Sequence, residues 1–307
     1  MNKTNLNDFF FLMFEGLQSA ILESELLDMK KEEYTLMAVN GHPIYLGSMQ
    51  MNGLKERESD KQENADTGRS LWDTSIQLSK CLEYACSNSN GNGNENDNDN
   101  QHLKKEHEEK ENKIKVDLSL RNKNVLELGS GLGLLGLTAM LCEARHVWMT
   151  DLMYCIENLQ INLKRNALLW DHWHKNAISE KNQNPFWPHS KHIFALDWSD
   201  PKISLSTWDT NNTVDVIIGA DIIWVDELVA PLVQTIHYIY QNLANRNLIV
   251  IIAEQIRSQS VHTKFWNLMD QLNIYNPKHK VILENSKFSL PQFVSPKVQI
   301  TFVQCSQ

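Results

Sequence analysis

Residues 125–136 read VLELGSGLGLLG, and this stretch decides the fold. An apolar run leads directly into a glycine-rich turn, which opens into a second apolar run that can begin a helix. Because glycine has no side chain, such a turn lets backbone N–H groups approach a nucleotide-like ligand at the start of the helix. The stretch therefore predicts a buried strand, a ligand-binding turn and a helix in succession.

The spacing of the glycines and of the next acidic residue indicates what the turn binds. Gly131, Gly133 and Gly136 spell GxGxxG, and Asp151, at the end of the following strand-like run, lies twenty residues after Gly131. In this combination the carboxylate binds ribose hydroxyls, as it does in a dinucleotide site. The alternative is a turn in which the glycines serve only the geometry of the chain.

Strand-like and helix-like runs alternate along the rest of the chain, which indicates βαβ units and a mostly parallel sheet. Two final strand-like runs, 279–284 and 298–303, have no helical pattern between them, and we expect them to pair antiparallel at the sheet edge. The alternating runs are 124–128, 134–143, 146–150, 153–166, 192–196, 214–219, 228–242, 247–253 and 261–272.

The N-terminal part of the chain adds a hairpin and a helix. Asn40-Gly41 separates the apolar runs 34–39 and 43–49. Asn-Gly between such runs is the strongest local signal for a β-hairpin, because both residues tolerate a positive φ. Apolar residues at helical intervals over 70–85 predict an amphipathic helix with Trp72 in its first turn.

A polar segment follows this helix. Residues 87–101 read SNSNGNGNENDNDNQ, and residues 102–115 continue as a run of charges. Almost none of these side chains can be buried, so residues 87–115 are predicted to form a disordered, low-complexity insert. Metal binding or self-association by the Asn/Asp tract is the functional alternative.

Composition and charge narrow the class of protein. With 307 residues, 42% hydrophobic and 22% charged, the chain has the composition of a folded soluble protein. A net charge of −9 and a pI near 5.7 disfavour nucleic acid and anionic membranes as partners. The apolar run 9–14 is much shorter than the roughly 20 residues that span a bilayer, and Glu15 follows where a signal peptide needs small residues.

The cysteines indicate the compartment. They are scattered and form no CxxC pair, which favours buried free thiols in a reducing environment. We therefore expect a cytoplasmic protein, with the nucleus as the alternative. The five residues are Cys81, Cys86, Cys142, Cys155 and Cys305.

One further residue changes the interpretation of which ligand the glycine turn binds. Glu127 stands two positions before Gly129, so the turn reads E-x-G-x-G-x-G and opens one glycine earlier than the dinucleotide fingerprint. This pattern resembles motif I of the class I methyltransferases. Similarity to the family-16 methyltransferases extends over about residues 68–273, apart from the insert. It is carried by LWDTS at 71–75, Asp151-Leu152, the helical turn 158–162, LDW at 196–198 and GADIIW at 219–224.

That family includes lysine methyltransferases that act on chaperones, valosin-containing protein and translation elongation factors. The resemblance implies a Rossmann-like class I methyltransferase sheet of seven strands, mostly parallel with an antiparallel edge strand. It also implies S-adenosyl-L-methionine as the cofactor. Residues 1–69 would be an N-terminal extension with the hairpin, and residues 70–307 the methyltransferase domain, interrupted by the insert at 87–115.

The resemblance assigns residues to the amino-acid and ribose end of the cofactor. Trp72 would pack beside the cofactor, and Gly129, Ser130 and Gly131 would line its amino-acid and ribose portion. Glu127 is placed with the same group, although its carboxylate could instead cap the loop through backbone hydrogen bonds.

The remaining cofactor contacts are assigned in the same way. Asp151 would take the ribose hydroxyls, and Asp197 and Trp198 would lie at the adenine. An indole offers apolar stacking area there, while a carboxylate or backbone group can read the ring edge. Ala220 would close the pocket beneath the methionine moiety. The alternative for each tryptophan is plain core packing.

Asp221 and Trp224 stand where the resembled family carries D-x-x-Y or D-x-x-F. Lysine has an ordinary pKa of about 10.4 and must lose its proton before it can attack a methyl group. A carboxylate at Asp221 would orient the substrate amine, and Trp224 would hold the alkyl stem or the cation with its ring face. Trp224 lacks the phenol hydroxyl of a tyrosine. The alternative for Asp221 is a cap on the following helix.

Three other features carry weaker signals. Glu254 and Arg257 follow the fifth strand-like run, and we interpret them as a surface ion pair, with a substrate contact as the alternative. His172 and His174 are interpreted as part of a solvated loop, since two histidines without a third ligand make a poor metal site. The NPFW at 184–187 is similar to a motif of nucleic-acid amino-methyltransferases but precedes the third strand instead of following the fourth.

These observations favour an S-adenosylmethionine-dependent protein N-lysine methyltransferase with a protein substrate such as a chaperone or translation factor, and no metal. Cofactor motifs do not report the acceptor, so arginine, histidine and small molecules remain alternative substrates. An NAD-dependent oxidoreductase and a non-catalytic binding module on the same fold are the alternatives from other classes.

Overall fold

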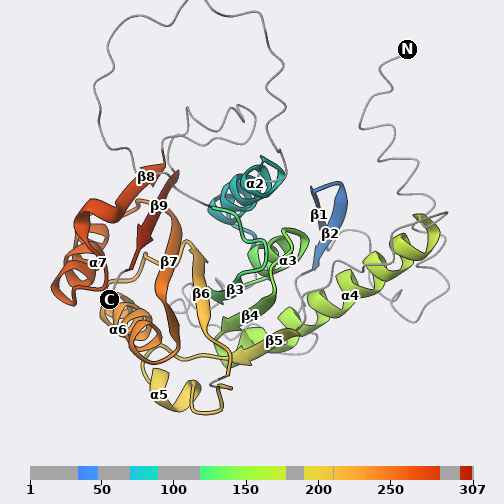
Figure 1. The fold of residues 1–307 in the computed structure, drawn as a ribbon. Helices are drawn as coiled ribbons and strands as arrows, with labels where there is room; N and C mark the ends of the chain where they lie inside the picture. The colour runs from blue at the N-terminus through green and yellow to red at the C-terminus, as the bar shows by residue number, and fades with distance from the viewer. Residues whose placement is uncertain are drawn as a thin grey trace, which may run out of the picture.

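A central β-sheet separates two layers of helices (Figure 1). The computed structural model describes residues 34–47, 70–88, 118–177, 190–209, 211–283 and 298–305. Within these residues the large sheet has seven strands in the order β5-β4-β3-β6-β7-β9-β8. The strands are β3 (Asn124–Leu128), β4 (His146–Asp151), β5 (Ser190–Ala195), β6 (Val214–Ala220), β7 (Ala244–Gln255), β8 (Lys280–Leu283) and β9 (Val298–Gln304).

The sheet is mostly parallel, which confirms the fold class. The five strands from β5 to β7 run parallel, and β9 pairs antiparallel with both β7 and β8. The two C-terminal strands thus pair as predicted, and the antiparallel strand lies one place in from the edge. Burial explains this order: β9 buries Phe302 and Val303 on opposite faces, whereas Ile282 of the short edge strand β8 is half exposed.

The apolar residues of the strands alternate between two cores. Val125 faces the layer that contains α2, α3 and α4, and Leu126 faces the layer that contains α5, α6 and α7. Strands buried on both faces are apolar at nearly every position, as the run before the glycine turn is. The helices are α2 (Asp73–Asn88), α3 (Leu134–Leu141), α4 (Met153–Ala177), α5 (Pro201–Ser204), α6 (Asp226–Asn242) and α7 (Gln259–Gln271).

The strand order reverses at β3. The chain first adds β4 and β5 on one side of β3 and then adds β6 and β7 on the other side. At such a switch point the connections leave in opposite directions, so the carboxyl ends of β3 and β6 border an open crevice. The topology therefore places a ligand site next to the glycine turn.

The predicted N-terminal hairpin is present. β1 (Tyr34–Val39) and β2 (His42–Gly47) pair antiparallel across a two-residue turn. Asn40 and Gly41 have φ angles of +49° and +77°, the conformation that favours Asn-Gly in such turns. The hairpin packs on the same face of the sheet as α2 and α4 (Figure 1).

Several element boundaries differ from the sequence-based expectation, and two of the differences change an interpretation. α4 continues to Ala177, so His172 and His174 belong to a helix and not to a loop. Residues 167–177 contain neither glycine nor proline, and nothing in them ends the helix that was predicted to stop at 166. α2 includes Ser87 and Asn88, so the predicted insert cannot begin before residue 89. Most of that insert and the NPFW at 184–187 lie outside the described residues.

Two further findings concern the described part of the chain. The five cysteines are buried and take part in no disulfide, as expected. None of the helices described is both long enough and apolar enough to cross a membrane.

Candidate active site

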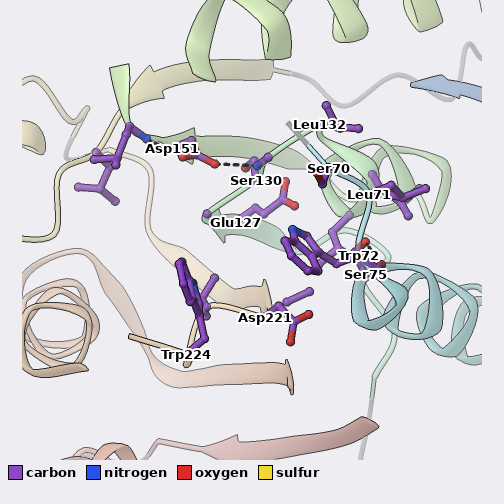
Figure 2. Close-up of a pocket in the computed structure, with 18 of the residues that line it drawn as sticks. Ser70, Leu71, Trp72, Ser75, Glu127, Ser130, Leu132, Asp151, Asp221 and Trp224 are labelled. Carbon is purple, nitrogen blue, oxygen red and sulfur yellow. Dashed lines mark hydrogen bonds between the residues drawn. The ribbon is translucent and has the colours of Figure 1, made fainter. Parts of the chain in front are cut away.

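A cavity of about 430 Å³ lies at the carboxyl ends of the parallel strands, beside the switch point. Figure 2 shows side chains from α2, β3, β4 and the loop after β6 arranged around it. Every residue that the sequence predicted for the site lines this cavity, although the role of each stays a prediction. These residues are Trp72, Glu127, Gly129, Ser130, Gly131, Asp151, Asp197, Trp198, Ala220, Asp221 and Trp224.

The glycine turn between β3 and α3 forms one wall. Gly129, Gly131 and Gly133 have φ angles of +65°, +53° and +92°, in the left-handed region that favours glycine. A Cβ atom on Gly129 would lie 2.8 Å from Cγ2 of Ile222. The turn is held to the neighbouring strand by a hydrogen bond of 2.9 Å from the N–H of Ser130 to the carbonyl of Thr150. A side chain at Gly129 would therefore displace the opposite wall.

Asp151 at the end of β4 fixes the same turn. One carboxylate oxygen accepts the N–H of Gly131 at 2.7 Å, and the other accepts the N–H of Leu152 at 2.7 Å (Figure 2). Burial raises the pKa of Asp151, and these two backbone hydrogen bonds act in the opposite direction. The Cys155 side chain also bonds this carboxylate. A carboxylate offers about four acceptor sites, so the group can still accept a ligand hydroxyl.

Glu127 and Ser130 place buried polar atoms in the cavity wall. Oε2 of Glu127 and Oγ of Ser130 are buried, and neither has a partner of hydrogen-bonding geometry among the described residues. Burial raises the pKa of Glu127 to about 8. The Ser130 side chain and the Gly136 backbone still lie close enough to Glu127 to act against the rise of its pKa. Unpaired buried polar atoms are rare and point to a missing partner. An acceptor and a hydroxyl at this position suit the charged end of an amino-acid-like ligand.

Asp197 and Trp198 form the wall after β5. Oδ1 of Asp197 accepts the backbone N–H of Ser199 at 2.9 Å and its hydroxyl at 2.7 Å, which closes a tight turn. The carbonyl of Trp198 accepts the hydroxyl of Thr235 on α6 at 3.3 Å. A Cβ atom on Gly129 would lie 3.6 Å from the Trp198 ring, so the indole borders the glycine turn.

Asp221 follows β6 in a left-handed conformation, with φ of +53°. Its carboxylate accepts the N–H of Gln255 at 3.0 Å and Nη2 of Arg257 at 3.0 Å. The following helix, α6, begins at Asp226, and its N-cap residue Val225 makes no side-chain cap. Asp221 binds the end of β7 instead, so the interpretation of Asp221 as a helix cap is wrong.

Arg257 is the residue that sequence reasoning misplaced. It lines the cavity and forms an ion pair, but its partner is Asp221. Its guanidinium carbon lies 5.2 Å from the centre of the Trp72 ring, a cation–π distance. Glu254 instead pairs with Nδ1 of His262 at 2.9 Å and does not line the cavity. The position of Arg257 at the carboxyl end of a parallel strand was the available signal.

The other lining residues were not predicted. Most are apolar, and they come from the loops at the ends of the strands and from the first turns of helices. They are Ser70, Leu71, Ser75, Leu132, Leu134, Leu135, Leu152, Tyr154, Leu196, Ile222 and Leu228. Across the described ranges no group of three or more His, Cys, Asp or Glu side chains could hold a metal ion.

Comparison with known proteins gives consistent matches. A family model described as lysine methyltransferase matches residues 52–272. The protein N-lysine methyltransferase METTL21A of Xenopus tropicalis is 29% identical over 138 residues, which cover 45% of this chain and 52% of that protein. The mouse METTL21A is 29% identical over 132 residues, covering 43% and 49% of the two chains. The chain therefore matches about half the length of these curated relatives.

Solved structures are similar more distantly. A SAM-dependent methyltransferase from Streptococcus mutans is 14% identical with a TM-score of 0.45, covering 90% of this chain and 56% of that one. A fibrillarin pre-rRNA processing protein from Methanococcus jannaschii is 10% identical with a TM-score of 0.43, covering 91% and 100%.

Proposed function

This chain belongs to the lysine methyltransferase family, and from that membership we propose that it methylates lysine side chains of a non-histone protein. Its cofactor is S-adenosyl-L-methionine, and the reaction is a methyl transfer. The proposal of a protein acceptor is supported by the similarity to two METTL21A proteins, which are protein N-lysine methyltransferases. A chaperone or translation factor in the cytoplasm is the acceptor that we propose to test first.

The residues present fit this cofactor. Oε2 of Glu127 and Oγ of Ser130 are the unpaired buried atoms that an amino-acid moiety would engage. The Asp151 carboxylate would accept the ribose hydroxyls, and the Trp198 ring would stack on the adenine. When bound, S-adenosyl-L-methionine supplies a methyl carbon attached to a positively charged sulfur. The cavity thus offers a partner of suitable chemistry to each part of the molecule.

Asp221 would position the acceptor. The lysine amine must approach the methyl carbon in line and uncharged, because its lone pair forms the new C–N bond as the C–S bond breaks. Each oxygen of the Asp221 carboxylate already accepts one hydrogen bond and keeps a second lone pair for the incoming amine. Asp221 is therefore assigned to hold and orient the amine, which releases its proton to solvent before attack.

Trp224 would form the acceptor wall. Its half-buried ring lines the same cavity as Asp221. An indole packs against the alkyl stem of a lysine and attracts an ammonium group by its ring face. Because it has no hydroxyl, the amine receives no hydrogen bond of the kind that a tyrosine would make. The observation that carries the proposal is that the glycine turn and this acidic-aromatic pair share one cavity.

The test is methyl transfer from radiolabelled S-adenosyl-L-methionine into a cytosolic lysate, followed by identification of the labelled protein and residue. We expect the label in a small number of proteins and on the nitrogen of lysine. The Gly129→Arg variant is the control and should transfer nothing, because its side chain fills the cavity. Label on arginine, histidine or a small molecule would contradict the proposed acceptor.

A further inference from the structure

The charges that line the cavity are unequal. Among the described residues that line it, Arg257 is the one basic side chain, while four carry carboxyl groups. These carboxyl groups come from the ends of β3, β4 and β6 and from the loop after β5. They are Glu127, Asp151, Asp197 and Asp221. Arg257 pairs with the acidic residue that faces the proposed acceptor, which raises the question of what this cation does there.

The position of Arg257 is fixed from three directions. Nη2 lies 3.0 Å from Oδ2 of Asp221 and 3.4 Å from Oε1 of Gln255. The guanidinium also lies over the ring of Trp72, which precedes α2. The carboxylate of Asp221 is 6% exposed, so solvent screens its charge poorly, whereas the Arg257 side chain is 37% exposed and reaches solvent. The cation and the carboxylate therefore act on the cavity as a pair with no net charge.

This pairing matters because only the uncharged amine can attack. An unpaired buried carboxylate would stabilise the lysine ammonium and keep it protonated. Next to a neutral ion pair the lysine ammonium gains little electrostatic stabilisation. The neutral amine can still donate a hydrogen bond to the carboxylate. Resting on the proposed function, we propose that Arg257 is a positioning residue that neutralises Asp221 so that the acceptor amine is held uncharged.

The other ionisable groups that line the cavity do not affect a comparison between the wild type and variants of Arg257 or Asp221. Glu127, Asp151 and Asp197 line it from the β3, β4 and β5 ends, and Tyr154 lines it from α4. The lining residues that α2 and α6 contribute are uncharged. All of these are the same in a variant of Arg257 or Asp221. A difference between such variants therefore reports the Asp221–Arg257 pair.

A pair of cofactor analogues tests the inference without the acceptor. Sinefungin carries an amino group where the cofactor carries its transferable methyl group, and S-adenosylhomocysteine carries nothing there. An alkyl amine is protonated at pH 7. The ratio of the two dissociation constants, measured by calorimetry on the full chain, therefore reports how the site treats an ammonium at the reacting position. A substitution that weakens the rest of the cofactor site changes both dissociation constants by the same factor, so their ratio stays the same.

The variants are expected to move this ratio in opposite directions. Arg257→Gln leaves Asp221 unpaired, so sinefungin should gain at least tenfold in affinity relative to S-adenosylhomocysteine at pH 7. Asp221→Asn leaves the cation unpaired and should shift the ratio against sinefungin. The double variant carries neither charge and should return to the wild-type ratio. If the role of Arg257 were purely structural, Arg257→Gln would weaken the binding of both ligands equally and leave the ratio unchanged.

Two controls complete the experiment. Arg257→Lys keeps the charge and should stay within about threefold of the wild-type ratio. Lys264→Gln breaks an exposed ion pair with Asp226 that does not line the cavity, and it should have no effect. If Arg257→Gln does not fold, Asp221→Asn alone decides: an unchanged ratio overturns the inference. Failure of lysine labelling in a lysate would instead overturn the proposed acceptor, which the analogue ratio does not involve.

Discussion

The backbone of Asp221 adopts a conformation that non-glycine residues take at a cost on the order of 1 kcal/mol. Three hydrogen bonds hold it there: its N–H donates to the carbonyl of Ala253 at 2.8 Å, and its carboxylate accepts from Gln255 and Arg257. Such strain persists where surrounding contacts compensate for it, and it gathers at functional sites. The conformation turns the carboxylate toward the end of β7 and into the cavity wall.

Asp221→Asn should retain S-adenosylhomocysteine affinity within a few fold and lower methyl transfer by at least tenfold. The amide keeps an acceptor for the N–H of Gln255, but it replaces the second carboxylate oxygen with a donor, so the amine loses an acceptor and the Arg257 cation loses its counter-charge. Calorimetry and single-turnover transfer to the identified acceptor measure the two quantities. Trp224→Tyr is the companion variant: it restores a hydroxyl and should remain active with altered acceptor preference. Wild-type transfer by Asp221→Asn would remove Asp221 from the mechanism.

Glu127 should make the stability of the cofactor-free protein depend on pH. Burial raises its pKa from 4.5 to about 8, so the folded protein holds a proton that the unfolded chain releases. This contribution to stability is complete below pH 4.5 and is lost as the pH rises through about 8. Relative to Glu127→Gln, the wild type should lose up to about 1.4 kcal/mol per pH unit in this window. Denaturant unfolding of both proteins at pH 5 to 8 measures it, and a constant difference would contradict the buried carboxyl.

At the level of elements, two asparagine side chains of α4 bond the backbone of β2, as a neighbouring strand would. Asn166 accepts the N–H of Tyr45 at 2.8 Å and donates to its carbonyl at 2.7 Å. One turn earlier, Asn162 makes the same pair of bonds with Gly47, each of 3.0 Å. Asn162 also donates to the carbonyl of Leu132 in the glycine turn at 3.0 Å. The hairpin is thus connected through α4 to the cofactor side of the cavity.

Asn166→Ala should lower the free energy of unfolding by about 1–3 kcal/mol, because it leaves partly buried backbone groups of β2 unpaired. Amide exchange of Tyr45 should become faster, while S-adenosylhomocysteine affinity should change little. Asn162→Ala should also weaken the binding of S-adenosylhomocysteine, because it removes the hydrogen bond to the carbonyl of Leu132. Gln160→Ala, at an exposed position of the same helix, is the control. Equal effects of Asn162→Ala and Asn166→Ala on affinity would contradict the connection to the glycine turn.

At the scale of the whole molecule, ligand binding should increase the stability of the folded protein. A ligand that binds only the folded state stabilises it by about 2.7 kcal/mol at one hundred times its dissociation constant. S-adenosylhomocysteine should therefore raise the melting temperature by several degrees, and NAD at equal concentration should not. Gly129→Arg should remain folded and lose the shift, because its side chain would fill the cavity. A shift with NAD, or a shift retained by Gly129→Arg, would contradict the assigned pocket.

The sequence alone determined the class of the sheet and about half of the residues that line the cavity, because the signals are local. The strand, turn and helix at 125–136 follow one another without interruption. Glu127, Asp151 and Asp221 stand at the carboxyl ends of strands, and those ends meet at one edge of a parallel sheet. Knowing the order of the strands was enough to bring these side chains together.

Tertiary structure alone decided the contacts between distant segments. Arg257 lies 36 positions after Asp221, and its partner could not be read from either neighbourhood. The end of α4 was missed for the related reason that no glycine or proline marks it near residue 166. The place of β9 inside the edge depends on which strand has two buried faces. Ion pairs, helix ends and edge positions are set by packing against the rest of the chain, and a local pattern does not contain that information.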